Sequence, residues 1–84
     1  QMHFDYRYRD QPEFEVAAIY RDDRFTYIRA APQEIPALYE IKDGKPSLIE
    51  FRFDGGLYTV PKILDRGYLA IGKKKLHFTR EAER

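Results

Sequence analysis

The 84-residue chain has no cysteine and no tryptophan, and it contains only one methionine and one serine. Without cysteine, the chain has no disulfide framework, no thiol nucleophile and none of the cysteine spacings of a zinc finger. No apolar run approaches the roughly 18 residues that a membrane-spanning helix needs. A recognisable signal peptide is also missing, and the chain starts within a strand pattern at Gln1. We therefore expect one small domain of a longer secreted protein, with its targeting information elsewhere.

The chain also lacks an excess of charge of either sign. Its 15 Lys and Arg residues against 14 Asp and Glu residues leave a net charge of +1. Dedicated nucleic-acid binders gain most of their affinity from excess positive charge, so this balance argues against one. What the chain has in quantity is aromatic residues, with seven Tyr and six Phe. Such residues fit strands better than helices.

Apolar and polar residues alternate in many short stretches, which is typical of half-buried strands. These stretches are residues 3–9, 14–20, 25–30, 38–42, 48–54, 57–60, 68–71 and 76–79. Turn signals separate them, among them Asp22–Asp23, Asp43–Gly44 and Gly55–Gly56. No amphipathic helix of useful length is encoded. We therefore predict an all-β fold, a small antiparallel β-sandwich or barrel of about eight short strands, forming one domain over residues 1–84 with a frayed tail at 81–84.

The clearest alternation, LIEFRFD at residues 48–54, predicts one strand with a buried face. Ile49, Phe51 and Phe53 would share that face, because side chains two residues apart point the same way. If Phe51 lies in the core, Phe51→Ala should cost about 3–5 kcal/mol.

The residues that carry chemistry in enzymes are scarce and scattered. Ser47 follows a proline in a hairpin turn and has no base beside it in the sequence. His3 and His77 lie in separate predicted strands, and two ligands do not close a zinc site. Asp22–Asp23 is a turn pair rather than two carboxylates held apart across a cleft. We predict no catalytic residues, no metal, no cofactor and no small-molecule substrate.

The opening stretch HFDYRYR combines aromatic and basic residues, as sheets that bind single-stranded nucleic acid do. However, side chains alternate along a strand, so its tyrosines and arginines would point to opposite faces. We therefore predict a two-faced strand whose rings point inward or into an interface. A terminal strand also has an unpaired edge, which a strand from a partner protein could cover.

An alternative function stays open: a small β-barrel that binds single-stranded nucleic acid through the opening stretch and the lysine run Lys73–Lys75.

The lysine run itself also has two interpretations. It is predicted at a hairpin tip, where a solvated turn is the simplest interpretation. The other interpretation is a contact with phosphate-bearing lipid headgroups or an acidic partner.

Three stretches, DDRFTYIRA, IPALYEIKDGKPSLIEFRF and GGLYTVPKILDRGYLAIGKKKLHF, resemble the C-terminal domain of the TrbG/CagX family. These proteins are outer-membrane core-complex subunits of type IV secretion and conjugation systems. The resemblance covers roughly residues 4–80 and rests on the order and spacing of RFTYI, PAL before an aromatic residue, the DGK turn and ILDRGYLAIG. The family usually has a glycine between the acidic pair and the arginine. Here Asp23 runs straight into Arg24, so we expect that turn to be built differently.

The resemblance implies a non-catalytic β-sandwich in the periplasm, associated with the outer membrane without inserting into it. It implies three partners: a small outer-membrane lipoprotein that adds a strand, a channel-forming subunit that spans the periplasm, and copies of the chain in a homo-oligomeric ring. Carried onto this sequence, the lipoprotein contact falls on the opening strand, and contacts with neighbouring subunits fall on the loop Ala31–Pro36 and the lysine hairpin. The candidate partner-binding residues are Phe4, Tyr6, Arg7, Tyr8, Arg9, Pro32, Pro36, Lys73 and Lys74.

Overall fold

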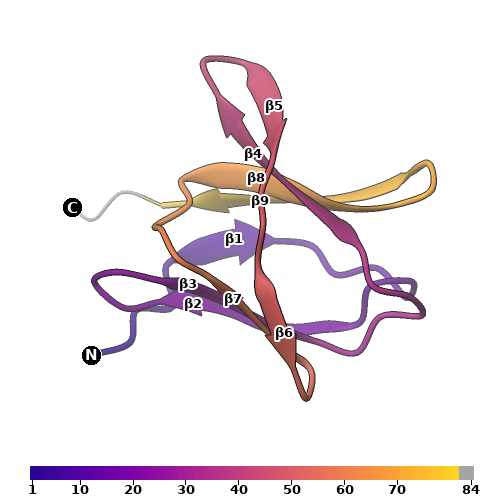
Figure 1. The fold of residues 1–84 in the computed structure, drawn as a ribbon, viewed down its shortest axis with the longest axis horizontal. Helices are drawn as coiled ribbons and strands as arrows, with labels where there is room; N and C mark the ends of the chain where they lie inside the picture. Colours follow the sequence, from indigo (N-terminus) through magenta and orange to yellow (C-terminus); the bar gives the residue numbers. More distant parts are fainter. Residues whose placement is uncertain (82–84) are drawn as a thin grey trace.

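The computed structural model describes residues 1–81, and within that range it contains nine strands and no helix. The strands are β1 (Tyr6–Tyr8), β2 (Val16–Arg21), β3 (Thr26–Ala30), β4 (Ala37–Lys42), β5 (Lys45–Leu48), β6 (Arg52–Asp54), β7 (Leu57–Val60), β8 (Arg66–Ile71) and β9 (Lys74–Arg80). They form a five-stranded sheet in the order β1-β9-β8-β4-β5 and a four-stranded sheet in the order β2-β3-β7-β6. All pairs are antiparallel, and the two sheets lie one above the other (Figure 1). The predicted all-β sandwich is confirmed. Most of the predicted tail, residues 82–84, lies outside the described residues.

The core lies between the two sheets and is filled by inward-pointing side chains from both. The hydrophobic ones with no more than 2% exposure are Phe14, Ile28, Leu38, Tyr58, Val60, Leu64, Leu69, Leu76 and Phe78. Each such side chain contributes about 1.5–3 kcal/mol relative to an exposed one. Most occupy alternate positions of the strands, which is why the period-two pattern located them.

One position in the five-stranded sheet requires glycine. A Cβ on Gly67 would lie 2.3 Å from the carbonyl oxygen of Tyr39 in β4 and 2.9 Å from a ring carbon of Phe78 in β9. Real Cβ atoms do not approach other atoms this closely, so β4, β8 and the Phe78 ring pack together only because residue 67 has no side chain.

Two hairpins close through turns that the sequence predicted. The φ angles are 54° and 75° at Asp43 and Gly44, and 57° and 85° at Gly55 and Gly56. Positive φ at both central residues is the signature of the type I′ turn, which matches the twist of the flanking strands.

The β2–β3 turn is built differently from these two turns. Neither Asp23 nor Arg24 has a positive φ. Instead, the Asp22 carboxylate accepts hydrogen bonds from the backbone N–H groups of Arg24 at 2.8 Å and Phe25 at 2.7 Å. The side chain therefore provides the acceptor that stabilises the turn.

Two segments cross from one sheet to the other, one on each side of the sandwich (Figure 1). In the first, residues 3–8, His3 exchanges two backbone hydrogen bonds with Arg21 of β2, at 2.7 and 3.0 Å, before β1 pairs with β9. In the second, residues 45–54, β5 pairs with β4 and β6 pairs with β7. Between them, Ile49 N–H donates to the Leu38 carbonyl at 2.9 Å.

The second crossing corrects the prediction of one continuous strand at 48–54. Residues 49–51 connect the two sheets, so the alternation belongs to two short strands and not to one. Ile49 and Phe51 are half-buried against the core, but Phe53 is 45% exposed, so its predicted burial is wrong. The physical reason is that β5 and β6 are the edges of their sheets, and no described strand covers this side.

The end of the β4–β5 hairpin projects beyond the rest of the five-stranded sheet (Figure 1). Every residue from 42 to 48 is exposed. Its Leu48 side chain is 67% exposed, which makes it one of the most exposed large apolar residues described.

Candidate functional site

Strand β1 has a free edge. It is the outer strand of the five-stranded sheet, and β9 is the one strand that pairs with it among residues 1–81. Beside it, the Asp5 carbonyl accepts a hydrogen bond from Glu81 N–H at 2.7 Å. Because bonded pairs alternate in antiparallel ladders, Arg7 bonds to β9, whereas the N–H and C=O groups of Tyr6 and Tyr8 point toward the open edge.

The Tyr6 side chain fixes β1 to the rest of the molecule. It is 8% exposed, its hydroxyl donates to the Leu64 carbonyl, and its ring meets Phe78 edge to face at 5.9 Å. Nearby, the Thr26 hydroxyl donates to the Lys62 carbonyl at 2.8 Å and accepts from Leu64 N–H at 2.9 Å. Burial raises the pKa of Tyr6. Its ring therefore belongs to the core, and only its backbone faces a possible partner.

The other predicted contact residues of the opening strand differ in exposure. Arg7 is exposed and pairs with Glu81, and Arg9 is exposed beyond the end of the strand. Tyr8 is half-buried against the core, and burial raises its pKa. The alternation therefore separates rings from arginines, as the sequence predicted, and β1 has no exposed row of rings on which bases could stack.

Phe4 belongs to an aromatic cluster that the sequence reasoning missed. It is 69% exposed and stacks on Tyr20 at 5.0 Å, Tyr20 stacks on Tyr27 at 5.2 Å, and Phe25 meets Tyr27 at 6.3 Å. Tyr20 and Tyr27 are cross-strand neighbours on the outer side of the four-stranded sheet. Their equal distance from the β2–β3 turn was the sequence signal that could have revealed the pair.

This cluster is linked to the β2–β3 turn through a hydrogen bond. The Tyr27 hydroxyl donates to Asp22 Oδ2 at 2.7 Å. Together with the two backbone N–H donors, this bond lowers the pKa of Asp22 to about 2, and the same bond raises the pKa of Tyr27.

The remaining predicted contact residues lie in a loop and a hairpin tip. Pro32 is half-buried and Pro36 is buried, whereas Lys73 and Lys74 are exposed. Pro36 therefore supports its loop from inside, and the exposed residues of that loop are the ones available to another subunit.

Glu13 connects this loop to the lysine hairpin. Its carbonyl accepts from Gln33 N–H at 3.1 Å, and its carboxylate lies 3.4 Å from Lys74 Nζ. The structure thus brings two segments, residues 31–36 and the β8–β9 tip, to the same end of the sandwich, although they are about 40 residues apart in sequence.

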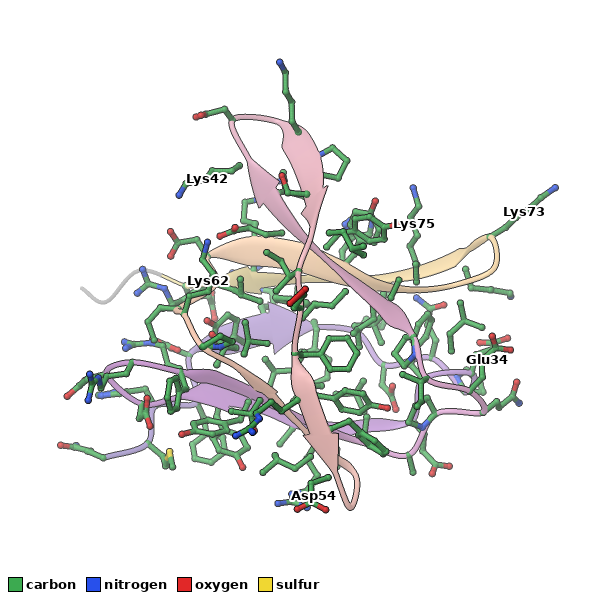
Figure 2. The ribbon with its side chains drawn as sticks, in the orientation of Figure 1. Glu34, Lys42, Asp54, Lys62, Lys73 and Lys75 are labelled. Carbon is green, nitrogen blue, oxygen red and sulfur yellow. The ribbon has the colours of Figure 1, made fainter. Side chains whose placement is uncertain are left out.

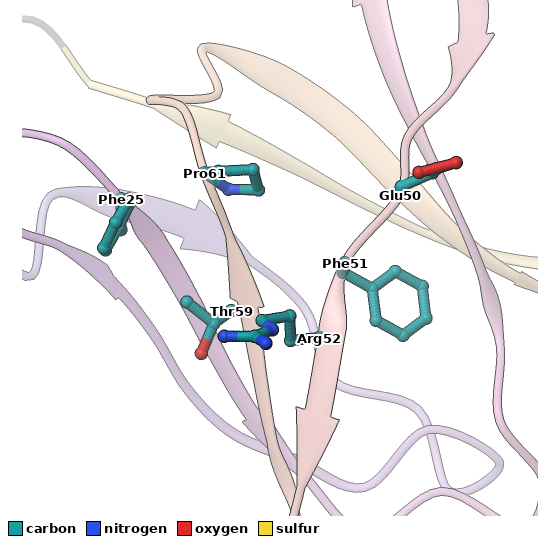
Figure 3. A pocket seen from close by; sticks show the side chains of 6 residues that line it. All are labelled: Phe25, Glu50, Phe51, Arg52, Thr59 and Pro61. Carbon is teal, nitrogen blue, oxygen red and sulfur yellow. The ribbon is translucent and has the colours of Figure 1, made fainter.

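A groove lies at the second crossing. It has a volume of about 400 Å³ and is lined by Phe25, Glu50, Phe51, Arg52, Thr59 and Pro61. Figure 3 shows Phe51 and Arg52 pointing to opposite sides of the backbone, with Thr59 beside Arg52. A second depression, of about 490 Å³, shares Arg52 and Thr59 and extends to Phe53.

Tyr58 lies beside this groove with an unsatisfied hydroxyl. The residue is 1% exposed, its ring contacts Phe51 at 5.2 Å and Phe53 at 4.6 Å, and its hydroxyl has no hydrogen-bond partner in the described chain. Burial raises the pKa of Tyr58. The edge at β6 is therefore less completely packed than the edge at β1.

Comparison with known protein families matches the chain to the CagX family, described as conjugal transfer protein, over residues 1–81. The chain belongs to the CagX family. The resemblance predicted from the sequence is confirmed, and membership gives the chain a role in conjugation and type IV secretion. No curated protein matches the chain.

Within residues 1–81, this CagX-family chain has no cluster of three or more His, Cys, Asp or Glu residues that could hold a metal ion. The same residues contain no helix that is long and apolar enough to cross a membrane.

Proposed function

We propose that this CagX-family domain is a non-catalytic interaction module of a type IV secretion core complex at the periplasmic side of the outer membrane. In this proposal the free edge of β1 binds a small lipoprotein by strand addition. The observation that carries it is an edge strand with outward-pointing backbone groups at Tyr6 and Tyr8, held in place by the buried Tyr6 ring.

Strand addition along β1 alone would be weak. Each backbone hydrogen bond nets about 0.5–1.5 kcal/mol, and ordering an extended peptide offsets much of the total. A stable complex therefore needs side-chain contacts as well. Phe4, which is 69% exposed just before β1, is a suitable apolar contact. Assembly of many copies into a ring would add effective concentration.

The contacts with the channel-forming subunit and with neighbouring copies would use the end of the sandwich where residues 31–36 meet the β8–β9 tip. Support for this assignment comes from the exposure of Lys73 and Lys74 and from the link through Glu13.

Amide hydrogen exchange by NMR tests the lipoprotein edge. The chain is mixed with a synthetic peptide from the lipoprotein of the same secretion system. The amides of Tyr6 and Tyr8 should exchange fast in the free chain and slow at least tenfold at saturation. The Arg7 amide, which already bonds to β9, is the internal control.

The outcome separates the edge from the function. If the peptide binds and protects the amide of Phe53 in β6 while Tyr6 and Tyr8 stay unchanged, the lipoprotein uses the other edge. If no peptide of the lipoprotein binds, the proposal that this domain binds the lipoprotein is wrong.

A matched pair of variants tests the side-chain contact. Phe4→Ser should weaken peptide binding several-fold, because it removes an exposed ring beside the edge. Ile35→Ser removes a comparably exposed apolar side chain, 62% against 69%, from the loop at the far end and should leave binding unchanged. Equal effects of the two variants would contradict the assignment of the contact to β1.

Nucleic-acid binding is the competing function. Fluorescence anisotropy with labelled single strands at low salt should show no tight complex. A tight complex with a steep salt dependence would favour the nucleic-acid function instead.

A further inference from the structure

None of the paired strand positions that point to the outer face of the five-stranded sheet, all within residues 1–81, is acidic. The registers of the paired strands and the alternation of side chains along each strand identify the residues that point to this face. The set is Arg7, Ala37, Tyr39, Ile41, Pro46, Leu48, Arg66, Tyr68, Ala70, Lys75, His77 and Thr79. The chain has 14 Asp and Glu residues, so their absence from this face leaves it basic and apolar.

The basic and apolar residues occupy different halves of the outer face. On β4 and β5, Ile41 faces Pro46 and Tyr39 faces Leu48, and together they form an apolar strip. Leu48 is 67% exposed. This half ends at the projecting β4–β5 hairpin, which raises it above the rest of the sheet (Figure 1).

The basic half lies on β8, β9 and β1. Lys75 Nζ lies 4.9 Å above the Tyr68 ring, and Tyr68 stacks on Tyr39 at 4.9 Å and contacts His77 at 5.0 Å. Arg66 occupies the same face. Tyrosine rings therefore form the boundary between the two halves.

A further lysine, Lys73, lies at the tip of the β8–β9 hairpin, at the margin of the outer face. Figure 2 shows Lys73 and Lys75 on the side of the five-stranded sheet, with Asp54 at the opposite side of the molecule. Carboxylates lie at the borders of this face: Asp43 is in the β4–β5 turn, and Glu81 pairs with Arg7.

We propose that this outer face binds an anionic lipid surface. Its lysines and arginines would contact headgroup phosphates, and Ile41, Pro46 and Leu48 would lie at the boundary between headgroups and acyl chains. The side chains match the layers of a membrane surface, where cations meet phosphates, tyrosines lie at the interface and aliphatic groups lie deepest. This binding is adsorption and needs no membrane-spanning segment.

The observations favour a lipid surface over two other polyanions. A single-stranded nucleic acid would need exposed rings, but Tyr68 is 7% exposed and Lys75 covers it. The core of a protein interface is depleted of charged residues, whereas Arg7, Arg66 and Lys75 account for three of the twelve side chains on this face. The proposal concerns the outer face and not the β1 edge, so it does not depend on lipoprotein binding.

Vesicle flotation with the 84-residue chain tests the proposal. Vesicles that contain phosphatidylglycerol should carry the chain, and vesicles of phosphatidylcholine alone should not. High salt should release it, because salt screens exposed charges. Each lysine near an anionic surface contributes about fivefold, so the double variant Lys73→Gln, Lys75→Gln should bind about 25-fold more weakly.

A matched double variant separates the outer face from net charge. Arg29→Gln with Arg52→Gln removes two exposed cations from the four-stranded sheet and should leave binding within about twofold. For the apolar half, Leu48→Ser should weaken binding several-fold, and Ile35→Ser should not. Melting curves identify any variant whose loss comes from unfolding.

Three results would overturn the proposal. One is equal binding to neutral and anionic vesicles, and another is an equal loss in the lysine and arginine double variants. The third is absence from anionic vesicles combined with lysine-dependent binding to an acidic peptide or an oligonucleotide. That result would assign the face to a macromolecular polyanion.

Discussion

The two crossing segments solve the same topological task in different ways. Both leave one sheet and join the other, and both end in a three-residue edge strand, β1 or β6. In the first, Tyr6 is 8% exposed and bonds to the Leu64 carbonyl, and Asp5 pairs with Arg21 at 3.0 Å. In the second, Phe53 is 45% exposed and no side-chain hydrogen bond to the core is found in the described residues.

This difference shows that two edge strands of equal length can be anchored to the core to different extents. A buried anchor with a satisfied hydroxyl fixes the backbone of β1, so its open edge has a defined position. At β6, backbone pairing with β7 and aromatic contacts with Tyr58 hold the strand, and the groove beside it remains open. The first edge is therefore better prepared to bind an extended strand without further ordering.

The largest expected effect is loss of the anchor at β1. Tyr6→Ala should cost about 3–5 kcal/mol, because a large buried ring leaves a cavity. Tyr6→Phe keeps the ring and should cost about 1–3 kcal/mol, because the Leu64 carbonyl loses its donor. Urea denaturation measures both. A change below 0.5 kcal/mol for Tyr6→Phe, on the order of experimental scatter, would mean that the hydroxyl does not anchor the strand.

A smaller effect is expected at the second crossing. Phe51→Ala should cost about 1–2 kcal/mol, below the 3–5 kcal/mol expected for a fully buried ring, because Phe51 is half-buried. Phe53→Ala should cost less than about 1 kcal/mol for the same reason. Urea denaturation of these two variants measures both costs. If Phe53→Ala costs as much as Tyr6→Ala, the two crossings are equally well packed and the comparison fails.

The smallest effect concerns the turn that follows the first crossing. The pKa of Asp22 is lowered from 3.8 to about 2, so its carboxylate stabilises the fold above about pH 4 and loses that contribution as the pH falls toward 2. The melting temperature should therefore exceed that of Asp22→Asn at pH 5, and the gap should close near pH 2. A carboxyl NMR titration of Asp22 with a midpoint near 4 would contradict the hydrogen-bonded turn.

Local rules predicted the strands and hairpins well. The type I′ turns at Asp43–Gly44 and Gly55–Gly56 follow from residue identity, since few residues tolerate positive φ. The break between β5 and β6 at residues 49–51 could not be predicted from residue identity in this way. Ile49, Phe51 and Phe53 keep the same period of two across the crossing, so the pattern alone cannot show that two different sheets receive them.

The sequence indicated where the candidate edge strand lies, but it did not indicate the side-chain contacts that hold this strand in place. A terminal strand with alternating rings and arginines indicated an edge, and β1 is one. The Tyr6 anchor escaped prediction because its acceptor, Leu64, lies 58 positions further along the chain. Phe4 shares the parity of Tyr6 and yet points outward, because the backbone turns between the two sheets at this point.

The close packing at Gly67 has a consequence for how the β4–β5 hairpin is held. Any side chain at position 67 would meet the Tyr39 carbonyl at 2.3 Å, and β4 would have to shift. Because β4 continues directly into the hairpin, a single added methyl group in the middle of the sheet would tilt the whole projection. The direction in which the hairpin points thus depends on the lack of a Cβ atom at Gly67, several residues away from the hairpin tip.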